Sequence, residues 1–241
     1  MSPATAIREA KSRLARARSV TVLTGAGISA DSGIPTFRGA DGLWRNFRAE
    51  DLATPDAFAR DPRLVWEWYN WRRELIATKQ PNAGHRALVE LEQRHERFLL
   101  ITQNVDGLHR AAGSNKLLEI HGNIWKVRCT VCKQVEENRE VPIAIPPHCR
   151  ACHGLVRPHI VWFGEALEEE ALDRSMGAVA SCDVMLIIGT SGVVNPAASF
   201  ASIAKAAGAF VIEINLEEQP RSAMVDLVIG GRAAETVPLL L

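Results

Sequence analysis

Four of the five cysteines in this chain form two closely spaced pairs. Two residues separate Cys129 from Cys132, two separate Cys149 from Cys152, and sixteen lie between the pairs. Each pair can present two thiolates from one tight turn, so the four sulfurs can surround a zinc ion. Two disulfides are the alternative, which a reducing compartment disfavours. Because four sulfur ligands leave the metal no open position, we predict one structural zinc ion without a catalytic role.

Two histidines beside the second pair and the fifth cysteine have other interpretations. His148 and His153 flank the second pair and could replace a ligand, although we do not expect it. Cys182 stands alone in an apolar stretch, where a cysteine is usually a small buried hydrophobe.

A glycine-rich turn offers a second kind of chemistry. The apolar run 20–24 leads into a segment that fits the G-x-G-x-x-G/A pattern, namely Gly25, Ala26, Gly27, Ile28, Ser29 and Ala30. The first glycine permits a tight turn, and the second lets the backbone approach a pyrophosphate held by N–H groups at a helix start. By itself the pattern also fits an ordinary strand-to-helix turn, so it is weak evidence for a dinucleotide.

The position of acidic residues argues against an ordinary dehydrogenase. In those enzymes an acidic residue about twenty positions further on, at the end of the second strand, holds the adenine ribose. Glu50 and Asp51 lie near that distance, but within a stretch rich in aromatic residues. Asn215, which follows the apolar run 211–214, is the better candidate for the ribose.

Three further polar clusters follow apolar runs. They are residues 102–106, His121 with Gly122, and residues 189–192. Ligands bind at the carboxyl ends of parallel strands, so these clusters should meet the turn at Gly25 along one edge of a sheet. Any one cluster could be a helix cap or contain a buried core histidine, but four at the same edge favour a binding site.

The elements that would position these groups alternate along the chain. Apolar runs rich in Val, Ile and Leu predict strands at 20–24, 97–102, 117–121, 183–189, 209–215 and 226–229. Helix-like segments lie between them; Asn82 can cap one, and Asn195 can cap another that carries Pro196 in its first turn and Gly208 just past its end. This alternation predicts an α/β fold with a Rossmann-like, doubly wound parallel sheet.

Two stretches interrupt the alternation. Residues 33–77 are rich in proline and tryptophan and predict a module of loops and short helices, whereas residues 123–159 carry the paired cysteines and predict a small zinc ribbon. We therefore expect a discontinuous Rossmann-like domain formed by residues 1–32, 78–122 and 160–241, with the 33–77 module placed over its site.

Composition excludes several classes of protein. Among 241 residues, 28 Lys and Arg balance 28 Asp and Glu, so no global basic field attracts nucleic acid or a membrane. The apolar runs are too short to span a bilayer, and the first residues lack the apolar block of a secretory signal. We expect a soluble, cytoplasmic monomer that binds no specific nucleic acid and no membrane.

Taken together, the motifs resemble those of the sirtuins, in that family's order and over nearly the whole chain. They are Gly25-Ala26-Gly27-Ile28-Ser29, Gly33-Ile34-Pro35-x-Phe37-Arg38, Thr102-Gln103-Asn104-x-Asp106, His121-Gly122, the cysteine quartet, Val161-x-Phe163-Gly164-Glu165, Gly189-Thr190-Ser191 and Asn215-Leu216. The resemblance implies an NAD-dependent protein-lysine deacylase that consumes NAD as a co-substrate. Nicotinamide leaves, the acyl oxygen of the lysine amide attacks C1′ of the ribose, and O-acyl-ADP-ribose is released with the free lysine.

The resemblance also implies roles for individual residues. His121 is the general base, for which a histidine near its ordinary pKa is suited, and Asn104 acts with it in catalysis. Asn104 and Asp106 would orient the nicotinamide ribose and carboxamide, and Phe37 would exclude water from the reacting face. The implied NAD-binding residues are Gly25, Ala26, Gly27, Ile28, Ser29, Pro35, Phe37, Arg38, Trp44, Gln103, Asn104, Val105, Asp106, Gly189, Thr190, Ser191, Asn215, Leu216, Glu217 and Ala233.

The acylated peptide would add a strand between residues 161–164 and 192–194, contacted by Val161, Phe163, Gly164 and Val193. Tyr69 and Arg72 stand three apart in a predicted helix and share a face. They resemble the Tyr-x-x-Arg pair of the class III branch, which binds acyl groups ending in a carboxylate, because arginine supplies planar charged donors and tyrosine a hydroxyl. Tyr69 could instead lie in the core and Arg72 in solvent. We predict removal of succinyl and malonyl groups as well as acetyl.

Two other functions remain as alternatives. A mono-ADP-ribosyltransferase would use the same NAD site but leave ADP-ribose on a protein. A non-catalytic NAD-binding zinc-ribbon module would need no base, and the presence of His121, Asn104 and Asp106 together argues against it.

Overall fold

The computed structural model describes residues 2–36, 47–216 and 224–241. Its larger sheet has six strands, all parallel, in the spatial order β3 (Leu117–Glu119), β2 (Arg97–Thr102), β1 (Ser19–Thr24), β7 (Val184–Ile188), β8 (Phe210–Asn215) and β9 (Leu227–Gly230). The strand order reverses beside β1, as in a Rossmann fold, so the predicted doubly wound sheet is confirmed.

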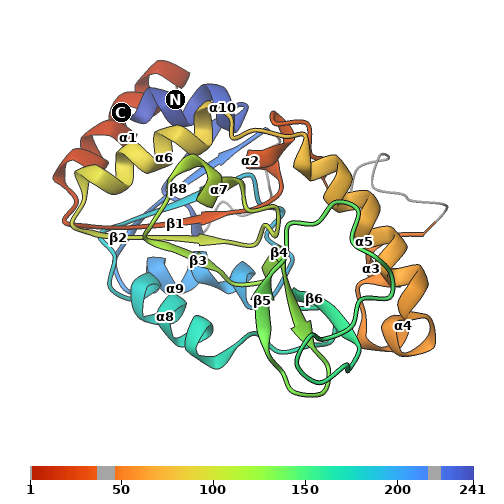
Figure 1. Ribbon diagram of the computed structural model, residues 1–241. Coiled ribbons are helices and arrows are strands. Elements are labelled where there is room, and N and C mark those ends of the chain that lie inside the picture. The colour runs from red at the N-terminus through yellow and green to blue at the C-terminus, as the bar shows by residue number, and fades with distance from the viewer. Residues whose placement is uncertain (1, 37–46, 217–223) are drawn as a thin grey trace.

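Helices cover both faces of this sheet (Figure 1). One face packs against α1 (Pro3–Arg16), α6 (Ala83–Arg94), α10 (Ala233–Thr236) and the 3₁₀ turn Val237–Leu240, and the other against α8 (Glu169–Val179) and α9 (Phe200–Ala206). Every residue of β1 and β7 is buried as a result. This double burial explains why these strands read as unbroken apolar runs.

The two predicted helix caps have different outcomes. Asn82 caps α6, and its Oδ1 accepts hydrogen bonds from the N–H groups of Gly84 at 2.9 Å and His85 at 3.4 Å. The predicted cap at Asn195 is wrong. A 3₁₀ turn, Ala197–Ser199, precedes α9, and its first N–H groups bond to the carbonyl oxygens of Val194 and Pro196.

The stretch 47–77 forms α3 (Ala49–Leu52), α4 (Pro55–Arg60) and α5 (Pro62–Ala77). At 16 residues, α5 is longer than the short helices expected there. Asp61 accepts a hydrogen bond from the N–H of Leu64 and Pro62 opens the helix, so both start signals act together.

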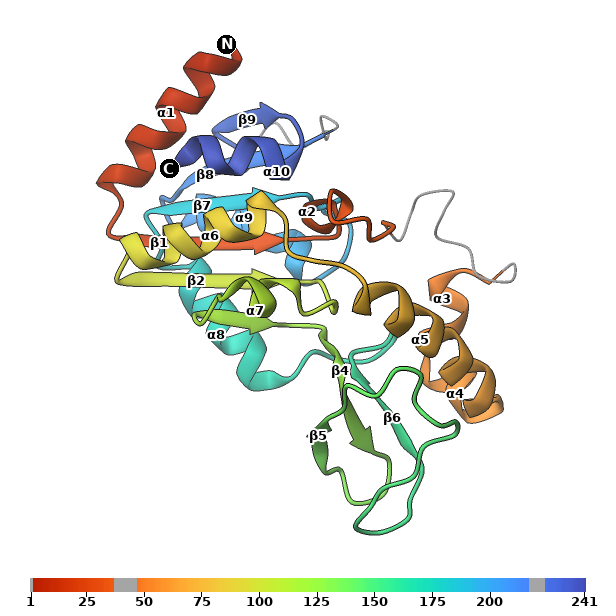
Figure 2. The same cartoon turned by 45° about the horizontal axis from the view of Figure 1, so that its top comes forward.

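The cysteine-bearing insert forms a second, antiparallel sheet in the order β5 (Val135–Glu137), β4 (Gly122–Cys129) and β6 (Val156–Ile160). Helix α5 lies against it (Figure 2), and one hydrophobic cluster holds both inserts. Trp66 Nε1 donates to the carbonyl oxygen of Val156 at 2.8 Å, and buried Arg73 donates to the carbonyl oxygens of Ile124 and Glu140. These bonds tie α5 to the small sheet.

Two short helices complete the described chain, α2 (Gly27–Ala30) after β1 and α7 (Leu108–Ala112) after β2. Within residues 2–36, 47–216 and 224–241, no helix combines the length and the apolar character needed to cross a membrane.

Candidate active site

The carboxyl ends of β1, β2, β7 and β8 border a cavity of about 1020 Å³. Its remaining walls come from α5, the segment after β6 and the segment after β7. All four predicted polar clusters contribute to it, through Gly25, Gln103, His121 and Gly189 among others. The sheet edge thus brings together groups that lie more than a hundred residues apart in the chain.

The glycine turn is shaped by its contact with a second glycine turn. A Cβ placed on Gly27 would lie 2.6 Å from the Cα of Gly189, and a Cβ on Gly25 would lie 2.8 Å from the carbonyl oxygen of Gly189. The N–H of Gly27 donates to that same oxygen at 2.9 Å. Glycine is therefore required at 25 and 27 by backbone packing between β1 and β7, in addition to any ligand that approaches the turn.

Most of the NAD-binding residues predicted from the sequence line the cavity. They are Gly25, Ala26, Gly27, Gln103, Asn104, Val105, Gly189, Thr190, Ser191, Asn215, Leu216 and Ala233. Four do not line it: Ile28, Ser29, Pro35 and Asp106. Ile28 is fully buried in the core on the α1 side of the sheet. Phe37, Arg38, Trp44 and Glu217 lie outside the described residues.

Asp106 and Ser29 support the cavity from behind. Ser29 Oγ donates to Asp106 Oδ2 at 2.8 Å and lies 3.3 Å from Asn104 Nδ2, which donates to the carbonyl oxygen of Gly25 at 3.0 Å. Burial raises the pKa of Asp106, while hydrogen bonds from Leu108 and Ser29 lower it. Ser29 thus links Asp106 to Asn104, and the predicted contact of Asp106 with the nicotinamide ribose and carboxamide stays a prediction.

His121 lies in the turn between β3 and β4 and is half-buried. Its Nδ1 is 3.0 Å from the carbonyl oxygen of Gln103, and a carbonyl only accepts, so Nδ1 carries the proton and Nε2 is left with a lone pair. Burial lowers the pKa of His121, and the bond to Gln103 partly opposes this. The pKa is therefore below the ordinary value assumed from the sequence, and the imidazole is neutral and able to accept a proton at neutral pH.

Tyr69 and Arg72 both line the cavity from α5. Tyr69 is 2 % exposed, and burial raises its pKa to about 12, so its hydroxyl keeps its proton. Burial lowers the pKa of Arg72, while Tyr69 and Asp106 raise it. The guanidinium also lies 5.2 Å from the ring centre of Trp68. Arg72 is half-buried and lines the cavity, whereas Tyr69 is also part of the hydrophobic core, as the alternative considered from the sequence had it.

The predicted peptide-contact residues also lie along the cavity. Val161, Phe163, Gly164 and Val193 all line it, and Phe163 and Val193 are exposed for 47 % and 55 % of their surface. The N–H of Phe163 donates to the carbonyl oxygen of Ala53, just after α3, and that of Val161 to the carbonyl oxygen of His121, just before β4, so backbone bonds hold this wall in place. Two exposed apolar side chains therefore flank the opening.

Sequence reasoning gave no individual role to several residues of the cavity wall, including Ala53, Trp68, Trp162, Leu167 and Arg232. Trp162 occupies the variable position of the Val161-x-Phe163-Gly164-Glu165 motif, so the motif itself gave it no role. Its bulk beside a predicted substrate strand was the signal available. Glu50 lines the cavity too, but from α3 and not from the end of a sheet strand.

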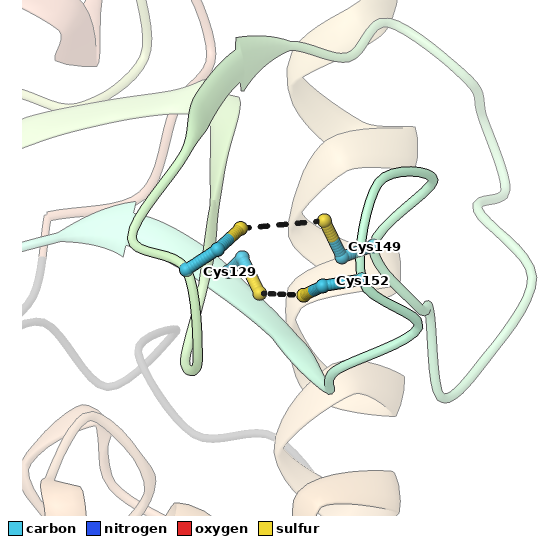
Figure 3. A group of neighbouring side chains, drawn as sticks. Cys129, Cys149 and Cys152 are labelled. Atoms are coloured by element: carbon cyan, nitrogen blue, oxygen red, sulfur yellow. Dashed lines mark hydrogen bonds between the residues drawn. The ribbon is translucent and has the colours of Figure 1, made fainter.

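The four paired cysteines converge in the small sheet (Figure 3). The Sγ atoms of Cys129 and Cys152 are 3.4 Å apart, those of Cys132 and Cys149 are 3.7 Å apart, and all four lie within 4.8 Å of one another. A tetrahedral zinc ion with Zn–S bonds of about 2.3 Å separates its sulfurs by about 3.8 Å. The donor set therefore fits zinc, and the sulfurs are too far apart for disulfides.

The electrostatics of Cys129 agree with this. Burial acts to raise its pKa, but hydrogen bonds from the backbone N–H groups of Cys132 and Val131 and from Cys152 lower the pKa overall, whereas the neighbouring thiols raise the pKa of Cys132. A thiolate at neutral pH is the form that binds a metal. His148 and His153 are not in this cluster, and Cys182 is a buried free thiol.

Known proteins that resemble this chain agree with the function that the site geometry suggests. Residues 25–196 match the model of the Sir2 family. This chain belongs to the Sir2 family. An NAD-dependent protein deacylase of Aquifex aeolicus is 55 % identical over 216 residues, which cover 89 % of this chain and 90 % of the relative. A second deacylase, from Pyrobaculum aerophilum, is 52 % identical over 227 residues, which cover 94 % and 91 %.

Solved structures of sirtuins show the same fold. A Sir2 homologue in complex with NAD superposes with a TM-score of 0.91 at 46 % identity, covering 97 % of this chain and 91 % of the other. Sir2Af2 bound to a myristoylated histone peptide has a TM-score of 0.79 at 33 % identity, covering 98 % and 95 %. The chain is therefore an enzyme of the sirtuin type, an NAD-dependent protein deacylase, and neither alternative function finds support.

Proposed function

We propose that this sirtuin removes succinyl and malonyl groups, as well as acetyl, from lysine side chains of proteins. The observation that carries the proposal is the placement of buried Tyr69 and half-buried Arg72 on α5, with both residues lining the cavity that would hold NAD. The planar guanidinium of an arginine binds a carboxylate through charge-assisted hydrogen bonds. An acyl group that ends in a carboxylate supplies that anion, and Tyr69 supplies a further donor.

The other residues that line or support the cavity would bind NAD and carry out the reaction. NAD lies with its pyrophosphate at the turn Gly25–Gly27 and its adenosine half along Gly189, Ser191 and Asn215. Nicotinamide would leave near Asn104, which Ser29 and Asp106 hold in position. His121 Nε2 accepts the proton relayed from the ribose hydroxyls once the acyl oxygen has attacked C1′. Phe37 remains the proposed cover of the reacting face.

The peptide would enter between residues 161–164 and 192–194 and bond through its backbone. Support comes from the exposed Phe163 and Val193 at this opening and from the relative whose structure holds a myristoylated histone peptide. We also propose that the protein is a monomer. We further propose a cytoplasmic location, where reducing conditions keep the four thiols available to zinc.

The test compares Arg72→Met on two peptides of one sequence that carry acetyl-lysine or succinyl-lysine. Loss of a charge-assisted bond should lower kcat/KM for the succinyl peptide by roughly 10- to 100-fold, while acetyl activity changes little. Arg63→Met, at a largely exposed arginine on the same helix, is the matched control and should change neither. Equal losses on both peptides for Arg72→Met would show that the acid-selective pocket is absent.

A further inference from the structure

We infer that Trp162 is a positioning residue for acidic acyl groups, because its indole N–H holds the Tyr69 hydroxyl in the orientation that donates into the cavity. The inference rests on the acid-acyl activity proposed above and adds a determinant of its selectivity. Its starting observation is that Trp162 Nε1 donates a hydrogen bond to the oxygen of Tyr69 at 2.9 Å, between two buried side chains.

The direction of this bond decides what Tyr69 can do. An indole N–H donates and never accepts, so the Tyr69 oxygen is the acceptor and its own proton points elsewhere. Among the described residues, the bond from Trp162 is the one hydrogen bond that the Tyr69 hydroxyl makes. The guanidinium of Arg72 carries donors alone and cannot take the proton. A substrate carboxylate beside Arg72 can accept that proton in a hydrogen bond. Trp162 therefore orients the Tyr69 hydroxyl so that it donates to the substrate carboxylate.

Trp162 is itself held rigidly. The guanidinium of Arg157 lies 3.3 Å from the centre of its ring, and Phe58 packs at a ring-centre distance of 5.2 Å. Glu165 binds Arg157 through both carboxylate oxygens, at 2.6 Å and 2.8 Å, and accepts the backbone N–H of Trp162 at 2.8 Å. The Arg157–Glu165 pair therefore fixes both the backbone and the ring of Trp162.

The consequence concerns selectivity and not the reaction shared by all substrates. An acetyl group has no terminal carboxylate and does not need the Tyr69 proton. His121 and Asn104, which serve both substrates, have no hydrogen bond to Trp162 or Tyr69. Loss of the indole N–H should therefore raise KM for succinyl-lysine and leave acetyl-lysine turnover nearly unchanged.

The experiment is a double-mutant cycle of Trp162→Phe and Tyr69→Phe on the matched acetyl and succinyl peptides. We expect kcat/KM for succinyl-lysine to fall about fivefold for Trp162→Phe and about tenfold for Tyr69→Phe, mainly through KM, with acetyl-lysine within about twofold. Because the first change acts through the second residue, the double variant should be no worse than Tyr69→Phe. Multiplying losses, or equal losses on both peptides, would overturn the inference.

Two controls separate this role from simple destabilisation. Trp66→Phe removes another buried indole whose N–H is bonded, to the carbonyl oxygen of Val156, and should lower stability without changing the succinyl-to-acetyl ratio. If Trp162→Phe does not fold, replacing the indole by benzothiophene keeps the two-ring shape and removes the N–H. If Arg72→Met loses succinyl activity selectively but Trp162→Phe does not, this inference is wrong and the proposed function stands. Equal losses in Arg72→Met overturn the proposed function and this inference with it.

Discussion

Replacement of Gly27 by alanine tests the contact between the two glycine turns. The new Cβ would lie 2.6 Å from the Cα and 2.9 Å from the carbonyl oxygen of Gly189, whereas non-bonded carbon atoms pack at about 3.5–4.0 Å. The turns must therefore separate by about 1 Å. Such overpacking costs about 1–3 kcal/mol, and each kcal/mol lowers the Tm of a domain of this size by about 2–4 °C. For a cost of about 2 kcal/mol, the middle of that range, we expect the Tm to fall by about 4–8 °C.

The same change should weaken NAD binding, because Gly25 and Gly27 both line the cavity. Differential scanning fluorimetry measures the Tm, and isothermal titration calorimetry measures the affinity for NAD. The matched control is Gly177→Ala in α8, where an added Cβ meets nothing within 4 Å. It should raise the Tm slightly, because alanine is favoured over glycine in a helix by about 1 kcal/mol. A Gly27→Ala protein with wild-type Tm and NAD affinity would refute the packing argument.

Further predictions concern the base and the metal. His121→Asn should lower deacylation by roughly 10²- to 10⁴-fold while calorimetry still detects NAD binding, and lost NAD binding would instead indicate a structural role. In the wild type, the base must be neutral and its pKa is lowered, so kcat/KM should fall only as the pH drops below about 6.5. An acid limb centred above that value would contradict the assigned cause. Cys132→Ser should lose the bound zinc in elemental analysis and lower the Tm, whereas Cys182→Ser, outside the cluster, should keep the metal. Full zinc content in Cys132→Ser would exclude the four-sulfur site.

The sheet could be predicted because its strands are buried on both faces. For β2 the predicted and observed limits coincide, Arg97–Thr102, and the other strands differ by one or two residues at their ends. The cap at Asn195 failed because a cap depends on the local backbone, and there a 3₁₀ turn replaces the first turn of the helix. The length of α5 was underestimated because the prolines and tryptophans of residues 33–77 suggested irregular structure. In the structure the buried tryptophans of α5 pack on the small sheet.

For the site, sequence spacing indicated which residue types meet but not which of them face the ligand. Asn104 and Asp106 belong to one motif, yet Asn104 lines the cavity and Asp106 lies behind it. Trp162 had no role in its motif, because its partner Tyr69 lies 93 positions away in the chain. Contacts of this kind exist only once α5 and the segment after β6 are packed together.

The sequence by itself determined the class of this protein. Strand periodicity, the cysteine spacing and the order of the motifs can all be recognised along the chain without knowing how it packs. Only the tertiary structure decided the orientation of each group. It placed Arg72 and Tyr69 along one cavity, lowered the pKa of His121 through desolvation, and placed Gly27 against Gly189. The physical reason is that burial, hydrogen-bond direction and steric contact depend on residues distant in the chain, and the chain brings those residues together only on folding.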